Sequence, residues 1–480
     1  MLHRSLSSDG PQHSLASVDA VRCSGRQRKR PTMSVRISSI GSCVSALLLA
    51  GACGSGNSNV PRSYEGTQDG GATVATLPNG DSASASTPDG GGDTTTLDGA
   101  SLPPTPTHCS GTPVSTPTAT PPQLTHGTWV NISPKSVPFG GNDATNAGDH
   151  VFVQGMAMDP CNLATLYVTV SGYNGTTNTV ESSGGLYKTT DAGASWTKIG
   201  PMDEPLNVRV DPTNPAHLYV GDGVRGATEG FWVSNDGGKT WAIPPGFTAA
   251  AKTVNTSDVY HVAPDPTNFN HVLVSFHNPW NSGGAVGDGG SATAGVFESF
   301  DGGNTWTAHN PPSGWSNSYG YDVFFLYEPT LGIGDANTWL YGTQGSGYWR
   351  TTDSGQTWKQ TSMNSMKHGG AQIYYTKEKV LYVTGSPDIL QSTDNGATWR
   401  DVTPVPSVGF IGIVGDGTTL YTGAATVGPS LASPESDGVK WAAFDSQQFN
   451  GSPFEMTYDA TDFIVYSAIW YSGVWALKTN

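Results

Sequence analysis

One eight-residue pattern recurs five times along the chain and limits the possible folds more than any other feature. It reads Ser/Thr-x-Asp-x-Gly-x-Ser/Thr-Trp, where x is any residue. The copies span residues 189–196, 234–241, 299–306, 351–358 and 392–399. Units that repeat at such intervals are typical of solenoids and propellers, in which each unit buries its apolar face against its neighbour.

The residue types in the pattern predict a tight turn between two antiparallel strands. Four copies follow a short apolar run, such as Gly185-Leu186-Tyr187, that is typical of a strand. The Asp carboxylate can accept hydrogen bonds from nearby backbone N–H groups, and Gly allows a positive φ. The Trp begins the next strand and supplies a large surface for burial. We therefore interpret the five aspartates as turn locks rather than as catalytic or metal-binding groups: Asp191, Asp236, Asp301, Asp353 and Asp394.

The pattern resembles the Asp-box, or bacterial neuraminidase repeat, and this resemblance implies a β-propeller. A second unit accompanies it: an apolar strand, a turn such as Asp211-Pro212-Thr213-Asn214-Pro215, and another strand. Seven such units are found when the weaker copies are included. The outer-strand tryptophans give the same number: Trp129, Trp196, Trp241, Trp306, Trp358, Trp399 and Trp441. We expect an all-β, seven-bladed propeller with four strands in each blade over residues 126–480.

The two ends of this region are expected to share one blade. Trp129 precedes the first complete repeat, whereas Gly473-Val474-Trp475 near the C-terminus has the pattern of an inner strand without an outer partner. Pairing of the two segments would close the ring and remove the exposed edge that an open sheet leaves.

Residues 1–52 are predicted to be a leader with a lipoprotein-type signal peptide, for which Met33 is the more natural start. Residues 37–52 form an apolar run of small residues behind Arg36, as in a secretory signal, and the run is too short for a comfortable membrane span. Its end, Ala50-Gly51-Ala52-Cys53, resembles a bacterial lipobox, which implies lipidation at Cys53. The alternative is an ordinary signal peptide followed by secretion.

Residues 53–125 are predicted to form a disordered tether. They are rich in Gly, Ser, Thr, Pro and Asp, so the burial of apolar surface cannot offset the entropy of ordering them. Two cysteines remain outside the leader and the lipid site, Cys109 and Cys161. An exported protein meets oxidising conditions, and we predict that these two form a disulfide; two unpaired thiols are the alternative.

The loop-rich face of the propeller is the expected place of function, because loops on a rigid scaffold carry binding residues. Three loops are long (169–183, 222–229 and 276–294), and further segments cross between blades at 244–258 and 310–321. Aromatic rings beside amide and carboxylate groups suit sugar binding. The candidate ligand-binding residues are Arg209, Arg225, Glu229, His261, His277, Trp280, Trp315, Tyr319, Asp322 and His368.

Several of these candidates have a simpler interpretation. Trp280 and Trp315 would equally pack beneath their own loops, and His277 and His368 would be ordinary loop histidines. Arg209 and His261 belong to inner strands and are expected to face the central channel. No His, Cys or Asp spacing is typical of a metal site, and we expect no cofactor.

Charge and arginine content exclude several functions. The formal net charge is −16, so nucleic acid should be repelled and anionic membrane surfaces will not attract the chain. From residue 126 onward the arginines are Arg209, Arg225, Arg350 and Arg400. The last two flank Asp-boxes, so the arginine triad of sialidases cannot be assembled.

The leading hypothesis is a monomeric, envelope-tethered bacterial lipoprotein, in the outer membrane or at the cell surface, whose propeller binds a glycan or an envelope protein. Without lipidation the protein would be secreted. The alternative is a glycoside hydrolase of xyloglucanase- or sialidase-like fold that uses a loop-face carboxylate pair. Xyloglucanase-type enzymes place two carboxylates in a cleft between two propellers, and this chain has one. The carboxylates available are Asp222, Glu229, Asp258, Asp288, Asp322 and Glu455. A third hypothesis is a structural or assembly role at the envelope.

Overall fold

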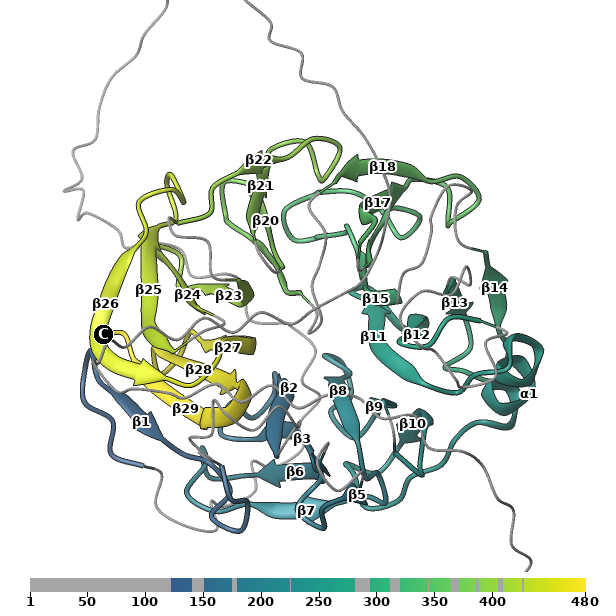
Figure 1. The fold of residues 1–480 in the computed structure, drawn as a ribbon, viewed down its shortest axis with the longest axis horizontal. Coiled ribbons are helices and arrows are strands. Elements are labelled where there is room, and N and C mark those ends of the chain that lie inside the picture. Colours follow the sequence, from purple (N-terminus) through teal and green to yellow (C-terminus); the bar gives the residue numbers. More distant parts are fainter. Residues whose placement is uncertain are drawn as a thin grey trace, which may run out of the picture. The chain divides into compact units, whose positions relative to one another are not determined.

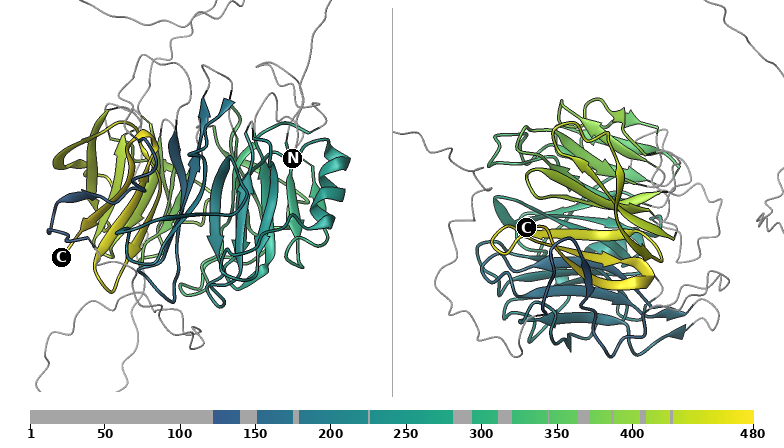
Figure 2. Two further views of the ribbon diagram at one scale, coloured as in Figure 1. Left: turned by 90° about the horizontal axis from the view of Figure 1, so that it is seen from below. Right: turned by 90° about the vertical axis from the view of Figure 1, so that its left-hand side faces the viewer.

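The computed structural model describes residues 122–139, 151–174, 179–224, 226–280, 294–310, 320–343, 345–363, 371–385, 388–404, 409–424 and 427–480. Within these ranges seven antiparallel sheets stand around a central axis, one sheet per blade (Figure 1). In the side views of Figure 2 the strands run along this axis. The prediction of a seven-bladed β-propeller is therefore confirmed. The leader and residues 53–121 of the predicted tether, including Cys53 and Cys109, lie outside the described residues.

The first three blades follow one another along the chain. Blade 1 contains β2 (Phe152–Met158), β3 (Leu166–Ser171), β6 (Gly185–Thr189) and β7 (Thr197–Ile199), with the small hairpin of β4 (Tyr173–Asn174) and β5 (Thr179–Val180) in its loop. Blade 2 contains β8 (Pro205–Val210), β9 (Leu218–Asp222) and β10 (Gly230–Ser234). Blade 3 contains β11 (Val259–Asp265), β12 (Asn268–Phe276), β13 (Val296–Ser299) and β14 (Thr307–His309).

The remaining four blades complete the ring. Blade 4 contains β15 (Gly320–Phe325), β16 (Trp339–Thr343), β17 (Gly347–Thr351) and β18 (Lys359–Ser362). Blade 5 contains β19 (Ile373–Tyr375), β20 (Leu381–Thr384), β21 (Ile389–Ser392) and β22 (Arg400–Asp401). Blade 6 contains β23 (Phe410–Gly415), β24 (Thr419–Ala424), β25 (Gly428–Pro434) and β26 (Ala442–Phe449). Blade 7 contains β27 (Pro453–Asp459), β28 (Ile464–Ile469), β29 (Gly473–Lys478) and β1 (Trp129–Asn131).

Blade 7 joins the two ends of the propeller, as the sequence predicts. The first strand, β1, lies antiparallel beside the last, β29, with Trp129 opposite Leu477 and Asn131 opposite Trp475. Trp129 is 5% exposed and meets Phe449 edge to face. The outer edge of the last blade is therefore covered by the N-terminal strand, which closes the ring.

Each Asp-box forms the predicted turn, and the turn of blade 3 illustrates it. Asp301 accepts hydrogen bonds from the backbone N–H of Thr305 at 2.8 Å, and from the hydroxyls of Thr305 at 2.7 Å and Ser299 at 2.9 Å. Gly303 has a φ of +94°, which suits glycine, and its carbonyl accepts a hydrogen bond from the Trp306 indole. The other four boxes repeat the three bonds to the carboxylate.

The junction between the closing blade and blade 1 is sealed by aromatic rings. Trp470, in the short 3-10 turn η1 (Trp470–Ser472), stacks on Phe152 with ring centroids 4.0 Å apart. Phe454 lies 4.1 Å from the same indole. Two rings pressed this closely against the indole make Trp470 a packing residue.

Two local features differ from the sequence-based expectation. The segment expected to cross between blades as a loop contains a helix, α1 (Pro245–Val254), which buries Phe247, Ala251 and Val254. Phe247 contacts Phe231 of blade 2 and Trp306 of blade 3, so tertiary packing stabilises this short helix. Blade 2 has three ladder strands, and only an isolated bridge between Val233 and Ala242 marks the place of the fourth.

Among the described residues no helix has the length and apolarity needed to cross a membrane.

Candidate functional site

Polar side chains from several blades meet at the centre of the ring. They line a cavity into which the inner strands direct Gln154, Asn207, Arg209, His261, Asp322, Gln372 and Glu455. The cavity offers about 50 Å³ to water molecules. That volume holds a few waters, whereas a site that encloses a whole small molecule takes roughly 300 Å³ or more. The described cavity therefore fits a protruding group of a larger ligand rather than a complete sugar.

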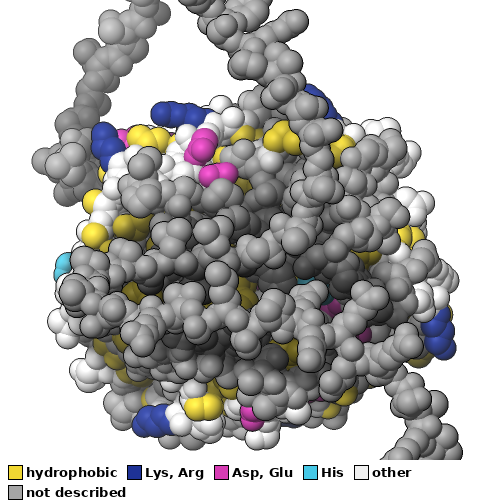
Figure 3. Space-filling model, viewed as in Figure 1, with side chains coloured by type: hydrophobic (Ala, Val, Ile, Leu, Met, Phe, Trp, Pro, Cys, Tyr) yellow, Lys and Arg dark blue, Asp and Glu magenta, His cyan; other side chains and the backbone are white. Residues whose placement is uncertain are grey.

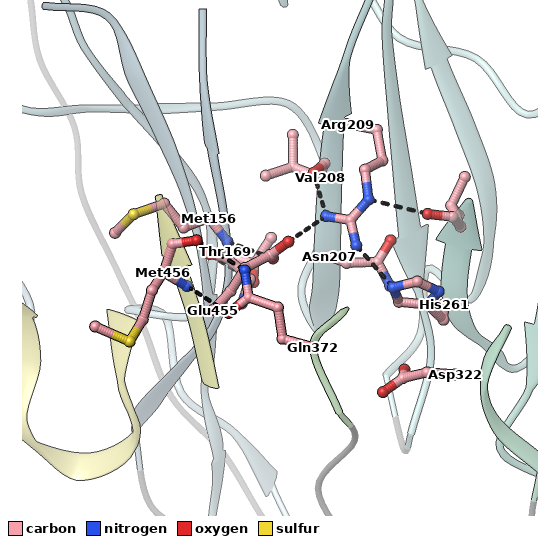
Figure 4. A network of polar contacts seen from close by, with 12 residues as sticks. Met156, Thr169, Asn207, Val208, Arg209, His261, Asp322, Gln372, Glu455 and Met456 are labelled. Atoms are coloured by element: carbon pink, nitrogen blue, oxygen red, sulfur yellow. Dashed lines mark hydrogen bonds and ion pairs between the residues drawn. The ribbon is translucent and has the colours of Figure 1, made fainter. Parts of the chain in front are cut away.

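An ion pair spans the cavity between blades 2 and 7 (Figure 4). Arg209 Nη1 lies 2.8 Å from Glu455 Oε1, and each side chain is 19% exposed. The second oxygen of Glu455 accepts the backbone N–H of Met156 at 2.9 Å. Burial raises the pKa of Glu455, while the Arg209 charge and the Met156 N–H oppose that rise. Because both charges are compensated within the protein, the pair adds no net charge to the channel.

The same guanidinium holds His261 in its neutral form. Arg209 Nη2 lies 2.7 Å from His261 Nε2, and His261 Nδ1 lies 3.0 Å from the carbonyl oxygen of Val323. A guanidinium can only donate and a carbonyl can only accept, so Nε2 is the acceptor and Nδ1 carries the proton. Burial, and after it the Arg209 charge, lower the pKa of His261 well below its usual value. This histidine is uncharged at neutral pH.

Asp322 is the second carboxyl group of the channel. Its side chain is 3% exposed and accepts the backbone N–H of Ala371. Burial raises its pKa to about 7, with a smaller contribution from Glu455, although the Ala371 N–H and Arg209 act in the opposite direction. Asp322 is thus protonated in part at neutral pH and can donate a hydrogen bond into the cavity.

Gln372 fixes the opposite wall by joining blades 5, 6 and 7. Its Oε1 accepts the backbone N–H groups of Ile413 at 3.0 Å and Met456 at 3.1 Å, and its Nε2 donates to the Met456 carbonyl at 2.8 Å. On the other side Asn207 Nδ2 donates to the Tyr260 carbonyl at 2.6 Å. Polar groups held by backbone partners are positioned before a ligand arrives, which lowers the entropic cost of binding.

The channel thus brings together three of the predicted residues: Arg209, His261 and Asp322. It also contains Gln154, Asn207 and Gln372, which the sequence analysis did not select. Glu455 was recognised only as an available carboxylate. The signal that could have found them is position, because all four lie on or immediately before an inner strand.

The other predicted residues lie away from the channel or outside the described residues. Trp280 is 7% exposed and packs on Phe276 and Phe297, so the structure makes it a packing residue of blade 3. His277 is also buried and contacts Asp258 Oδ2 at 3.1 Å, and Glu229 precedes β10. Residues outside the described ranges are Arg225, Asp288, Trp315, Tyr319 and His368.

Metal and disulfide chemistry is limited in the described part of the chain. No group of three or more His, Cys, Asp or Glu side chains there is arranged to hold a metal ion. Cys161, in the turn between β2 and β3, is disulfide-bonded. Because Cys109 lies outside the described residues, the pairing of these two cysteines stays a prediction.

Comparison with curated proteins finds distant relatives among xyloglucanases. A xyloglucanase of Hypocrea jecorina is 27% identical over 303 residues, which are 54% of this chain and 34% of that protein. Xyloglucanase Xgh74A of Acetivibrio thermocellus is 25% identical over 292 residues, covering 52% of this chain and 32% of that protein. A probable oligoxyloglucan-reducing end-specific xyloglucanase of Neosartorya fischeri is 24% identical over 286 residues, 55% of this chain and 32% of that protein.

Comparison with solved structures finds similar chains at low sequence identity. The extracellular domain of a hybrid two-component system of B. thetaiotaomicron has a TM-score of 0.48 at 11% identity, covering 68% of this chain and 40% of that one. YCF48 bound to a D1 peptide has a TM-score of 0.46 at 13% identity, covering 75% of this chain and 100% of that one. At these scores the likeness bears on neither site nor ligand. No family model matches the chain, and it spans about a third of the length of the curated relatives named above.

Proposed function

We propose that the propeller binds a neutral polysaccharide at its loop-rich face, with one sugar hydroxyl or hydroxymethyl group entering the central channel. One observation carries this proposal: the described lining of the channel presents no unpaired positive charge. Arg209 is paired with Glu455, His261 is held neutral by its two hydrogen bonds, and Asp322 is partly protonated. Such a site offers oriented donors and acceptors but no free cation, which suits hydroxyl groups and does not repay the desolvation of an anionic sugar.

The overall charge supports the same choice. At a net charge of −16 the protein repels polyanions at long range, so acidic polysaccharides approach it slowly. On the face shown in Figure 3 the visible Lys and Arg side chains are spread around the rim and do not gather in one patch. The curated relatives are named for xyloglucan, and xyloglucan is therefore the first neutral glycan to test.

A polysaccharide panel tests the proposal. The protein is run by affinity electrophoresis through gels that contain xyloglucan, mixed-linkage β-glucan, polygalacturonate or no polymer. We expect retardation by at least one neutral polymer and none by polygalacturonate. Retardation by polygalacturonate alone would contradict the proposal and indicate an acidic glycan as the ligand. Retardation by no polymer at all would also contradict it and leave a protein partner as the ligand.

A second candidate function is the hydrolysis of the bound glycan. Glycoside hydrolases commonly use one protonated carboxylic acid and one ionised carboxylate on either side of the scissile bond. Asp322, whose pKa burial raises to about 7, and Glu455, which faces Arg209, have these properties. We expect any released reducing sugar to disappear in D322N while retardation in the gel persists, since an amide can still donate but cannot transfer a proton.

We also propose that the propeller is held at a bacterial envelope through a lipid on Cys53 and the tether of residues 53–125. The support is the signal-like run before Cys53 and the composition of the tether. Labelling with a radioactive fatty acid in the native host tests this: label should enter the wild type and be lost in C53S.

A further inference from the structure

Three segments of blades 1 and 2 meet at the loop-rich end through buried acidic side chains. Asp203 and Glu204 precede the inner strand β8, Asp222 ends β9, and Thr228 precedes β10. Asp222 is 0% exposed and Glu204 is 1% exposed. Carboxyl groups this deeply buried need either a counter-charge or a proton.

The hydroxyl of Thr228 shows where one proton lies. Thr228 Oγ1 is 2.5 Å from Asp203 Oδ1 and 2.5 Å from Asp222 Oδ2, both hydrogen-bond distances. A hydroxyl carries a single hydrogen and can donate to only one of the two. The other carboxyl group must therefore donate to the hydroxyl oxygen.

The backbone decides which of the two carboxyl groups carries that proton. Asp203 accepts the N–H of Ala227 at 2.8 Å and that of Thr228 at 3.3 Å, as an ionised carboxylate does. Asp222 is the more deeply buried of the two, and burial raises its pKa to about 7; only in its ionised form would it accept hydrogen bonds from Thr228 and the backbone N–H of Glu204, which oppose that rise. The order of donation is thus Asp222 to Thr228, and Thr228 to Asp203.

Glu204 forms a second hydrogen bond between a buried carboxyl group and a hydroxyl, beside that of Asp222 and Thr228. Its Oε1 accepts the backbone N–H of Gly172 at 3.0 Å, and its Oε2 is hydrogen-bonded to the Ser171 hydroxyl at the end of β3. Burial raises the pKa of Glu204 to about 8, although the hydrogen bonds from Ser171 and Gly172 act in the opposite direction. Blade 1 is therefore connected to the start of β8 through a carboxyl group that also holds a proton at neutral pH.

We propose that Asp203, Thr228 and Asp222, completed by Glu204 and Ser171, form a proton-holding lock that ties the loop-rich end of blades 1 and 2 together in acid and loosens as the pH rises. The inference does not depend on the identity of the ligand. It bears on the channel because Asn207 and Arg209 lie on the same strand, β8, that the lock holds at its start.

The direction of the pH dependence follows from proton release on opening. In the open state Asp222 and Glu204 have ordinary pKa values of roughly 4, whereas in the closed state they keep their protons to about 7 and 8. The lock is therefore strongest below pH 4 and weakens as the pH rises toward 7 to 8, above which its strength is constant.

Other charged groups around the lock do not reverse this direction. Glu229 acts on Asp222 as a further negative charge, which favours the proton. Burial lowers the pKa of Lys198, and the charge of Asp203 opposes that shift. Asp258 has its own partners, the backbone N–H of Val224 and the ring of His277.

Hydrogen exchange measured by mass spectrometry between pH 5 and 8 tests the lock on the full chain. After correction for the intrinsic pH dependence of exchange, we expect protection of residues 202–207 and 226–230 in the wild type to fall by up to about tenfold per pH unit for each proton released. D222N keeps a donor to Thr228 but cannot ionise, so its slope should be reduced by one proton. E378Q, which changes an exposed glutamate in the turn between β19 and β20 of blade 5, should match the wild type.

A pair of variants at Thr228 separates the lock from ordinary packing. T228S keeps the bridging hydroxyl and should retain the wild-type slope. T228V deletes the hydroxyl and should lower the protection of residues 202–207 and 226–230 at pH 5 by tenfold or more. Between pH 5 and 8 the protection of T228V should then fall less than that of the wild type. Equal slopes in the wild type and D222N, or equal protection in T228S and T228V, would overturn the proposal.

Discussion

At the scale of single residues, the five repeated turns show that the same aspartate contributes differently to stability at a buried site and at an exposed one. Asp191 and Asp301 accept the same three hydrogen bonds, one from a backbone N–H and two from hydroxyls. Asp191 is 0% exposed, whereas Asp301 lies at the surface. Water can replace the lost acceptor at the exposed site but not at the buried one.

We therefore predict that D191A lowers the free energy of unfolding by about 2–3 kcal/mol, because buried donors are left without an acceptor. The matched change D301A should cost less than half as much. Urea denaturation of both variants measures the difference. Equal losses at the two sites would show that burial is not what makes Asp191 important.

The Arg209–Glu455 pair gives a second prediction. Removing Arg209 in R209M leaves Glu455 without its cation in a largely buried place, and we expect a loss of roughly 1–3 kcal/mol once the 19% exposure of each side chain is considered. K440M breaks a pair with Asp437 whose lysine is 76% exposed, and it should leave the unfolding midpoint unchanged. A comparable loss in both variants would contradict the account of the channel.

The residues of the site could be predicted only where the repeat pattern showed that they belong to an inner strand. Arg209 and His261 were expected in the channel because inner strands were recognisable in the sequence. For Gln154 and Gln372 a position on or beside an inner strand was not sufficient, since the shift of one residue in register decides whether a side chain faces the axis. The burial of Trp280 could not be predicted either, because it depends on contacts with Phe276 and Phe297 that a sequence pattern does not reveal.

At the scale of elements, the closure of blade 7 follows directly from the sequence. The C-terminal region lacks an outer strand, and the segment around Trp129 at the N-terminal end of the propeller supplies one. The helix α1 did not follow, since its ten residues are stabilised by contacts of Phe247 with blades 2 and 3 that no local pattern reveals. Strand number in blade 2 was overestimated for a similar reason: the Asp-box is present, but Val233 and Ala242 form only a single bridge.

The closing strand can be tested by proline substitution. The N–H of Ile132 donates to the Val474 carbonyl, and successive N–H groups alternate in direction along a strand, so that of Val130 also faces β29 while that of Asn131 faces outward. V130P should lower stability by about 3 kcal/mol, and N131P should have a much smaller effect. Thermal unfolding of both variants measures this, and an equal loss would mean that β1 is not held by its ladder to β29.

At the scale of the whole molecule, two groups of titrating residues pull stability in opposite directions. Burial raises the pKa of Glu204 to about 8 and those of Asp222 and Asp322 to about 7, so their contribution is complete below roughly pH 4 and is lost as the pH rises through those values. The pKa of Glu298 is lowered: burial opposes this, but hydrogen bonds from His271 and His309 outweigh it. Its contribution is present above about pH 4 and is lost as the pH falls.

These opposing effects predict a stability maximum in acid, at about pH 4 to 5. Scanning calorimetry of the protein from about pH 3 to pH 9 measures the melting temperature, which should fall on both sides of that maximum. In D222N the decline above pH 6 should be shallower. A melting temperature that rises steadily to pH 9 would contradict the assignment of protons to the buried carboxyl groups.

The central claim, that a neutral glycan reaches the channel, is tested most directly by calorimetric titration of a xyloglucan oligosaccharide into the wild type and two matched variants. Q154L removes a polar group from the channel wall, and Q448L makes the same change on the exposed outer strand of blade 6. We predict that Q154L weakens binding about tenfold, equivalent to roughly 1.4 kcal/mol, and that Q448L binds as the wild type does. Equal affinities in all three proteins would place the glycan elsewhere, and no heat of binding to any of them would contradict recognition of this glycan.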